Sequence, residues 1–165
     1  MANTDKALQQ LLQFCKDLKN DMKSSHAGAA ASVRGSVASV SLAADTMKLV
    51  PCNTFCSKTD DAFSLSGSGG LILPYAGVVE VSGNVYISAS TGQKGCYLKK
   101  GTTTANAVEI TSQYVAANGN GGVTSGKLII PVNAKDVIYM YARASVAGTF
   151  APNNTATHLD VCYIK

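Results

Sequence analysis

The chain of 165 residues has no tryptophan and is poor in the side chains that usually carry catalysis. Its only histidines are His26 and His158, and its only glutamates are Glu80 and Glu109. Charged residues make up 15% of the chain and the formal net charge is +4, so we expect no nucleic-acid partner. Low charge with 46% hydrophobic residues is also unlike a disordered chain and predicts a sizeable core.

Long hydrophobic runs are missing as well. No run approaches the ~18–20 apolar residues of a membrane helix, so no membrane span is expected. Residues 1–10 contain neither the apolar stretch nor the cleavage site of a signal peptide. We therefore expect synthesis in a cytoplasm. An odd number of cysteines cannot all pair within one chain, and this predicts mostly free, buried thiols at Cys15, Cys52, Cys56, Cys96 and Cys162.

The candidates for catalysis do not form a known set. A serine protease-like triad would need His158 and Asp160, which lie two apart in a predicted strand. They then share one face of the strand and form a surface pair. The two glutamates do not suggest the paired carboxylates of a glycosidase. These observations predict that the protein is not an enzyme.

Metal ligands are equally sparse. Cys52 and Cys56 are four apart, and the chain has no tight C-x-x-C pair of the kind that zinc sites use. Asp60 and Asp61 stand in no calcium-loop pattern. The glycine-rich residues 119–122 lack the Lys-Ser/Thr and the helix of a phosphate-binding loop. We expect no metal and no cofactor.

The first 25 residues predict a helix over residues 4–25, with Asn3 or Thr4 as N-cap. An apolar stripe with steps of three and four is typical of a short coiled coil. A helix this short and polar needs a partner. Self-association or docking onto a larger assembly is favoured, and packing back onto the same chain is the alternative. The stripe gives the first candidates for a trimer interface: Leu8, Leu11, Cys15, Leu18 and Met22.

Residues 26–45 are rich in Ala, Ser and Val, and predict a neck between the helix and the rest of the chain. Apolar residues again step by three and four, which fits a second, thinner helical stalk. Gly28 and Gly35 weaken a helix, so an extended segment is an equal alternative.

Residues 46–165 predict a head made of eight to ten short strands without helices between them. Residues 127–141, KLIIPVNAKDVIYMY, are two apolar runs around a polar turn, with Pro131 at a strand edge or bulge. The last residues alternate Leu159, Val161 and Tyr163 with polar side chains, and such a terminal strand is normally placed in the middle of a sheet. The pattern is typical of a β-sandwich or jelly roll.

The order of motifs in this head resembles the C1q/TNF-like jelly-roll family. The motifs are GGLILPYAGVVEVSGNVYI, CYLKKGTT, VTSGKLIIPVNAKDVIYMYA and NNTATHLDVCYIK, although Lys135 stands where the family usually has glycine. The resemblance implies a mainly β, ten-stranded jelly roll that assembles as a trimer with aromatic and aliphatic side chains near its axis. The candidates for this interface are Tyr75, Tyr86, Tyr139, Tyr141 and Tyr163.

The chain has no collagen-like repeat before the head, so it resembles a fibre or head-fibre protein of a bacteriophage more than a vertebrate C1q molecule. The function this implies is a non-enzymatic, adhesive homotrimer in a virion, anchored to the particle by its helix. A bacterial surface or spore-layer trimer that scaffolds or signals is the alternative. Exposed loops of the head would contact a host-surface glycan or protein, with these candidates: Lys94, Lys99, Lys100, Asn118 and Asn120.

Overall fold

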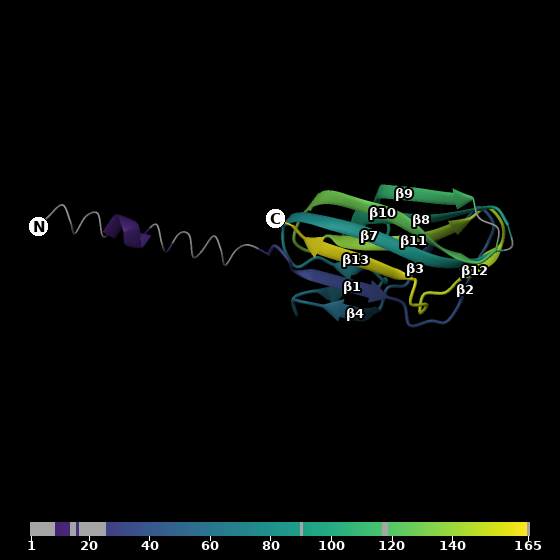
Figure 1. The fold of residues 1–165 in the computed structure, drawn as a ribbon, viewed down its shortest axis with the longest axis horizontal. Coiled ribbons are helices and arrows are strands. Elements are labelled where there is room, and N and C mark those ends of the chain that lie inside the picture. Colours follow the sequence, from purple (N-terminus) through teal and green to yellow (C-terminus); the bar gives the residue numbers. More distant parts are fainter. Residues whose placement is uncertain (1–8, 14–15, 17–25, 90, 117–118, 165) are drawn as a thin grey trace, which may run out of the picture.

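The computed structural model describes residues 9–13, 16, 26–89, 91–116 and 119–164. These residues build two antiparallel β-sheets that pack face to face (Figure 1). Residues 26–29, here called the N-terminal extension, lead into the sandwich at one end. Seven strands form sheet A and six form sheet B, so the strand count differs from the predicted ten. Within the described part of the chain, no helix is long and apolar enough to cross a membrane.

Sheet A has the order β2-β12-β7-β13-β1-β4, and β10 pairs with β7. Its strands are β1 (Ala30–Arg34), β2 (Val40–Leu42), β4 (Thr54–Lys58), β7 (Gly77–Ser88), β10 (Gly121–Val132), β12 (Gly148–Phe150) and β13 (His158–Tyr163). Sheet B has the order β5-β6-β11-β8-β9, and β3 pairs with β11. Its strands are β3 (Met47–Val50), β5 (Ser64–Leu65), β6 (Leu71–Ile72), β8 (Gln93–Gly101), β9 (Val108–Ala116) and β11 (Val137–Ala144).

The core between the sheets follows from the two-residue period of the strands. In β7, Val79, Val81, Val85 and Ile87 are fully buried, while the residues between them are half-exposed. Gly83 belongs to the buried series, and a Cβ at that position would come within 2.8 Å of the Leu98 side chain. The absence of a side chain there lets the two sheets pack closely.

The stretch at residues 127–141 forms two strands, as predicted, but they lie in different sheets. Residues 127–132 end β10, which pairs with β7, and residues 137–141 begin β11 in sheet B. Between them Lys135 has a φ of 71°, and the Asp136 carboxylate accepts the Asn133 backbone N–H at 2.9 Å. Pro131 lies on β10, an edge strand of sheet A, as expected for a residue without a backbone donor.

The C-terminal strand lies inside its sheet, as predicted. β13 pairs with β7 on one side and with β1 on the other, so both of its edges are hydrogen-bonded. Leu159, Val161 and Tyr163 point into the core, and each is at most 2% exposed.

Residues 26–45, predicted as a neck that is either helical or extended, contain two extended strands that belong to the sandwich. Residues 30–34 are β1, paired with β13 and β4, and residues 40–42 are β2, paired with β12. Neither part is a helical stalk. Small side chains step by two in an extended chain as readily as by three and four in a helix, so Ala31 and Val33 belong to the core of the sandwich. Of the predicted N-terminal helix, residues 9–13 and 16 are helical, and the rest lies outside the described residues.

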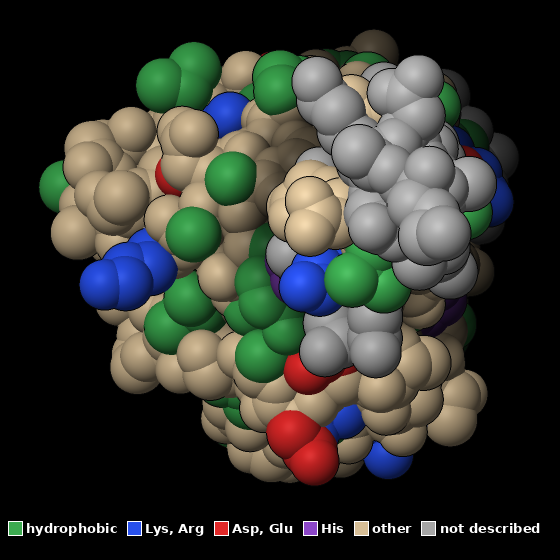
Figure 2. All heavy atoms as spheres, turned by 90° about the vertical axis from the view of Figure 1, so that its left-hand side faces the viewer, with side chains coloured by type: hydrophobic (Ala, Val, Ile, Leu, Met, Phe, Trp, Pro, Cys, Tyr) green, Lys and Arg blue, Asp and Glu red, His purple; other side chains and the backbone are tan. Residues whose placement is uncertain are grey.

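The sandwich has two ends that matter for function. At the near end the N-terminal extension leaves beside the C-terminus (Figure 1), and the connections at residues 73–76, 101–107 and 133–136 lie there. At the far end lie residues 91–92, 119–120 and 145–147. Figure 2 faces the near end, where charged side chains of the described residues are few among hydrophobic and uncharged ones.

Candidate functional site

The outer face of sheet A carries unusually small side chains on three adjacent strands. β1 contributes Ala30 and Ser32, β7 contributes Ser82, and β13 contributes Cys162, all on the side opposite the core. Because these side chains barely rise above the backbone, the face is hollowed there.

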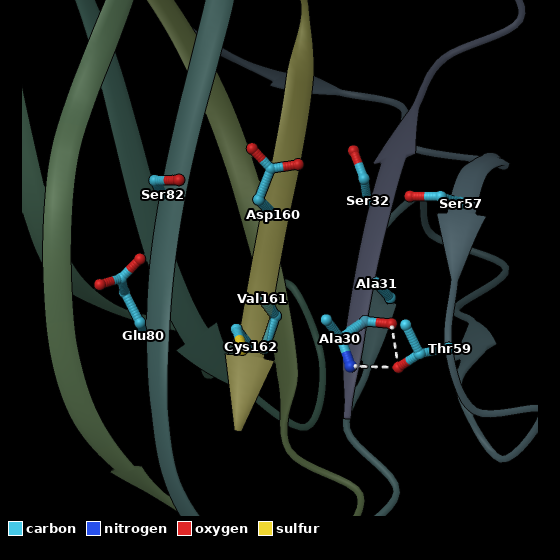
Figure 3. Close-up of a pocket in the computed structure, with 10 residues that line it drawn as sticks. All are labelled: Ala30, Ala31, Ser32, Ser57, Thr59, Glu80, Ser82, Asp160, Val161 and Cys162. Carbon is cyan, nitrogen blue, oxygen red and sulfur yellow. Dashed lines mark hydrogen bonds between the residues drawn. The ribbon is translucent and has the colours of Figure 1, made fainter. Parts of the chain in front are cut away.

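Figure 3 shows this hollow, which has a volume of about 190 Å³. The acidic side chains of Glu80 and Asp160 stand at it, and the Thr59 hydroxyl accepts the Ala30 backbone N–H at 2.8 Å on its β4 side. A second hollow, of about 460 Å³, lies nearby on the same sheet and is lined by Arg34, Phe55 and His158 among others. The outer face of sheet A is therefore shallowly hollowed and carries a few charged side chains.

Both carboxylates at the first hollow lie beside a basic side chain of the same chain. Lys127 donates to the Glu80 carboxylate at 2.7 Å, and this hydrogen bond and the attraction of the carboxylate raise the pKa of Lys127. His158 Nε2 lies 3.3 Å from Asp160 Oδ2, with both side chains more than a third exposed. This is the predicted surface pair, and no serine among the described residues is hydrogen-bonded to His158.

Large apolar side chains reach solvent around the same face. Ile129 on β10 is 61% exposed, and Ile164, just after β13, is 45% exposed. A solvated sheet face normally presents polar residues, so exposed isoleucines around a hollow of small residues are typical of a surface that another protein covers.

The outer face of sheet B has a different character. Four of the seven tyrosines lie on it, from β8, β9 and β11. Tyr139 and Tyr97 are almost fully buried, Tyr141 is half-buried and Tyr114 is 46% exposed. Arg143 and Lys99 lie among these rings.

A third cluster holds the N-terminal extension on the near end of the head. The His26 ring stacks on Tyr75 with centroids 3.4 Å apart and an interplanar angle of 4°. Tyr75 donates to the Asp60 carboxylate at 2.7 Å, and Tyr163 donates to the Tyr75 carbonyl at 2.7 Å. Hydrogen bonds from the Ala62 N–H and then from Tyr75 lower the pKa of Asp60, and the bond to Asp60 raises the pKa of Tyr75.

The structure separates the five tyrosines predicted for a trimer interface. Tyr139 and Tyr163 are 1% exposed within the single chain, and Tyr139 and Tyr141 lie on sheet B. Tyr75 is half-buried in the near-end cluster. Only Tyr86 lies half-buried on the outer face of sheet A.

The predicted helix residues are mostly outside the described part. Leu8, Cys15, Leu18 and Met22 lie outside the described residues, and Leu11 is helical and 60% exposed.

The predicted ligand loops do not come together. Residues 93–95 belong to β8, and Lys94 is fully buried with no hydrogen-bond partner for its Nζ among the described residues. Lys94 and Asn120 lie toward the far end, whereas Lys99 and Lys100 lie toward the near end of the same strand. Asn120 accepts the Ser88 hydroxyl at 2.7 Å, and Asn118 lies outside the described residues. The four described members of this set therefore do not form a single contact site.

The four described cysteines are free thiols, and two of them are buried. Cys52 and Cys96 are fully buried, and burial raises the pKa of each to about 12. Cys56 is exposed and Cys162 half-buried, and all four are free. Across residues 26–89, 91–116 and 119–164 and the described helical residues, no cluster of three metal-binding side chains is found.

Comparison with known proteins gives a fold and no close relative. No family model matches the sequence, and no curated protein matches it. Among solved structures, Eiger TNF from S. frugiperda superposes with a TM-score of 0.64 at 12% identity, over 84% of this chain and 94% of that one. The globular domain of zebrafish complement 1qA gives 0.55 at 18% identity, over 84% and 98%.

A third similar structure comes from a virus. The phage PRD1 vertex protein P5 superposes with a TM-score of 0.58 at 15% identity, over 86% of this chain and 100% of that one. At these identities the similarity concerns the fold alone. The predicted resemblance is confirmed at that level: the head of this protein has the TNF/C1q-like jelly-roll fold.

Proposed function

We propose that the protein is a non-enzymatic structural subunit that forms a homotrimer through the outer face of sheet A. The observation that supports this most directly is the hollow of small side chains at Ser32, Ser82 and Cys162, with exposed Ile129 near its edge. Small residues let the backbone of a second copy approach closely, and the isoleucine offers apolar area for burial. A TNF/C1q-like head is expected to assemble as a trimer, which suits this face.

The N-terminal helix extends the same assembly. Leu11 and Leu12 are 60% and 58% exposed on the described helical residues and have the composition of a coiled-coil contact. In the proposal, Leu8, Cys15, Leu18 and Met22 continue that contact. Three helices joined in this way would hold the near ends of the three heads together and anchor the trimer to a larger particle.

We place the trimer in a virion, as a fibre, head-fibre or decoration protein that contacts a host-surface glycan or protein. The fold similarity to the PRD1 vertex protein supports a virion role. The geometry supports the orientation, since the extension leaves from one end and the far-end loops point away from it (Figure 1). Three copies would add weak contacts as avidity.

Light scattering on the full chain tests the assembly. We expect three times the 17.0 kDa chain mass. Ser82→Arg places a long cation in the hollow of sheet A and should give monomers. Ser68→Arg makes the same change on the exposed β5–β6 loop of sheet B and should stay trimeric. A monomeric full chain, or a trimeric Ser82→Arg variant, would refute assembly through sheet A.

The virion role has its own test. Antibodies against the head should label purified particles at their surface in electron micrographs. Label confined to material that does not sediment with particles would contradict the role in a virion and leave the trimer untouched.

A further inference from the structure

The tyrosine face of sheet B, which we define as Tyr97, Lys99, Tyr114, Tyr141 and Arg143, is ordered by strand register. Tyr141 of β11 lies opposite Tyr97 of β8, and Arg143 lies opposite Gly95. Gly95 in turn lies opposite Tyr114 of β9. Since residues opposite one another in an antiparallel pair share a face, all five side chains stand on the side of sheet B away from the core.

Gly95 makes room for the rings. A Cβ at this position would come within 2.9 Å of Tyr97 Cε2 and 3.1 Å of the Tyr114 ring, so both rings cross over the bare backbone. Their centroids are 5.3 Å apart at an interplanar angle of 89°, a favourable edge-to-face contact. The two rings therefore form a rigidly packed aromatic surface, in which Tyr97 is buried and Tyr114 is exposed.

A loop limits the exposed face at one side. A Cβ on Gly70 would come within 2.6 Å of Tyr139 Cδ1, which shows that the β5–β6 loop lies against the Tyr139 ring. Tyr139 is buried in this way and is not part of the face. Beyond it, Tyr141, Arg143 and Tyr114 remain open to solvent.

Arg143 is positioned with most of its donors unused. Its guanidinium lies 5.9 Å from the centre of the Tyr114 ring, donates to the Tyr114 hydroxyl at 3.0 Å and donates to Asp45 at 3.1 Å. A guanidinium has five N–H donors, so three remain without a partner among the described residues. Asp45 and Tyr114 thus fix the orientation of the group and leave it able to bind an anion.

Lys99 supplies a second cation at the other side of the face. Its Nζ lies 5.0 Å from the centre of the Tyr141 ring and makes no hydrogen bond or ion pair with a described residue. Arg143 and Lys99 differ by four residues in register, which corresponds to about 14 Å along the strands. A ligand that reaches both cations is therefore longer than one sugar ring.

We propose that the tyrosine face binds an acidic oligosaccharide, one whose sugar rings carry carboxylates. A sugar ring offers an apolar C–H face to Tyr141 and Tyr114, and its carboxylate accepts from Arg143 in the bidentate geometry that guanidinium groups favour. The free groups on the face are mainly donors, which fits a ligand rich in acceptors. This inference rests on the proposed host-contact function and names its ligand class and its site.

Charge density separates this ligand from a nucleic acid. Glu109 lies opposite Lys99 in register, and Asp45 lies beside Arg143, so acidic groups accompany both cations. Binding to a phosphate backbone is driven by neutralising closely spaced phosphates with several cations. Two cations about 14 Å apart along the strands, each beside a carboxylate, suit sparse carboxylates better.

The test uses the full chain and its own tyrosine emission, which no tryptophan masks. The probes are oligogalacturonate and oligosialic acid, with a neutral maltooligosaccharide and single-stranded DNA for comparison. We expect a saturable change in emission with one or both acidic sugars and none with the neutral one. Failure of both acidic sugars to bind would overturn the proposal, as would tighter binding of the DNA.

Variants locate the site. Arg143→Gln should weaken binding of the acidic sugar about tenfold or more, because it removes a charged donor. Tyr114→Ala should weaken it, whereas Tyr114→Phe, which keeps the ring, should bind more tightly than Tyr114→Ala. Lys135→Gln removes the same charge from an exposed loop at the near end and should bind as the parent does.

Equal binding by Arg143→Gln and Lys135→Gln would overturn the assignment to this face. Light scattering on the same samples keeps the two proposals apart. A trimer that binds no acidic sugar refutes the saccharide site alone, and a monomer that binds it refutes only the assembly.

Discussion

The two outer faces of the sandwich carry different kinds of side chains. Sheet A presents small side chains around a hollow, with Glu80 paired to Lys127 and Asp160 close to His158 of the same chain. Sheet B presents tyrosine rings, with Arg143 and Lys99 held over them and largely free to donate. A face with little relief and few free charges suits close contact with another copy. A face with fixed rings and unused donors suits a polar ligand.

The largest effects on stability are expected from the core-facing sides of the two sheets, which should respond alike. Leu159→Ala in sheet A and Leu98→Ala in sheet B each remove a fully buried side chain from the same core. Each should lower the free energy of unfolding by about 2–5 kcal/mol. Urea denaturation at one fixed protein concentration measures both. If only one variant lost stability, the two sheets would not share one core.

Two lysines on the inner side of β8 should respond with opposite signs to the same change. Lys94 is fully buried without a hydrogen-bond partner among the described residues. Lys94→Met should therefore raise the free energy of unfolding by about 1–3 kcal/mol, since an unsatisfied buried group is removed. Lys100 donates to the Pro131 carbonyl at 2.9 Å and lies 3.6 Å from Asp136.

Lys100→Met is the matched control. It leaves a largely buried Asp136 without its cation and should lower the free energy of unfolding. Thermal denaturation of the two variants beside the parent checks the signs. A loss of stability in Lys94→Met would mean that the buried ammonium is stabilised by something other than the described residues.

Two glycines test how tightly the rings of the tyrosine face are packed. Gly95→Ala should push apart the Tyr97 and Tyr114 rings and cost about 1–3 kcal/mol, as overpacking usually does. A Cβ on Gly121 of β10 would meet no atom within 4 Å, so Gly121→Ala should be neutral or slightly stabilising. Calorimetry gives both melting temperatures. Equal changes in melting temperature would show that the Tyr97 and Tyr114 rings move apart at little cost and are not rigidly packed over Gly95.

The sequence predicted the fold well because β-sandwich cores leave a two-residue signature. The alternation at Leu159, Val161 and Tyr163 predicted a strand with one buried face, and its place at the end of the chain predicted the middle of the sheet, where it lies. It was ambiguous for residues 30–42, where small side chains fit a helix and a strand equally well. The choice between helix and strand depends on the strands that pair with these residues, and those strands are far away in sequence.

The candidate sites were predicted less well, for a related reason. Tyr97, Tyr114 and Arg143 come from three strands and meet only through register, so no motif in the sequence joins them. Lys94 and Lys99 were both predicted to lie in exposed ligand-contacting loops, but in the sheet Lys94 points inward and Lys99 outward. Knowing that Cys96 and Leu98 face the core would have separated them.

The smallest effect should come from the exposed ion pair of sheet A. Glu80 raises the pKa of Lys127, so the pair stabilises the folded state at pH values below the unfolded pKa, about 10.4, and loses this contribution as pH rises through the folded pKa. Melting temperatures measured between about pH 9 and pH 11.5 should therefore fall slightly more for the parent than for Glu80→Gln. Lys99 is held over a ring rather than beside a bonded carboxylate. Lys99→Gln should retain the fall of melting temperature with pH that Glu80→Gln partly loses. An equal fall in all three proteins would show that the cations of the two faces do not differ in their electrostatic contribution to stability.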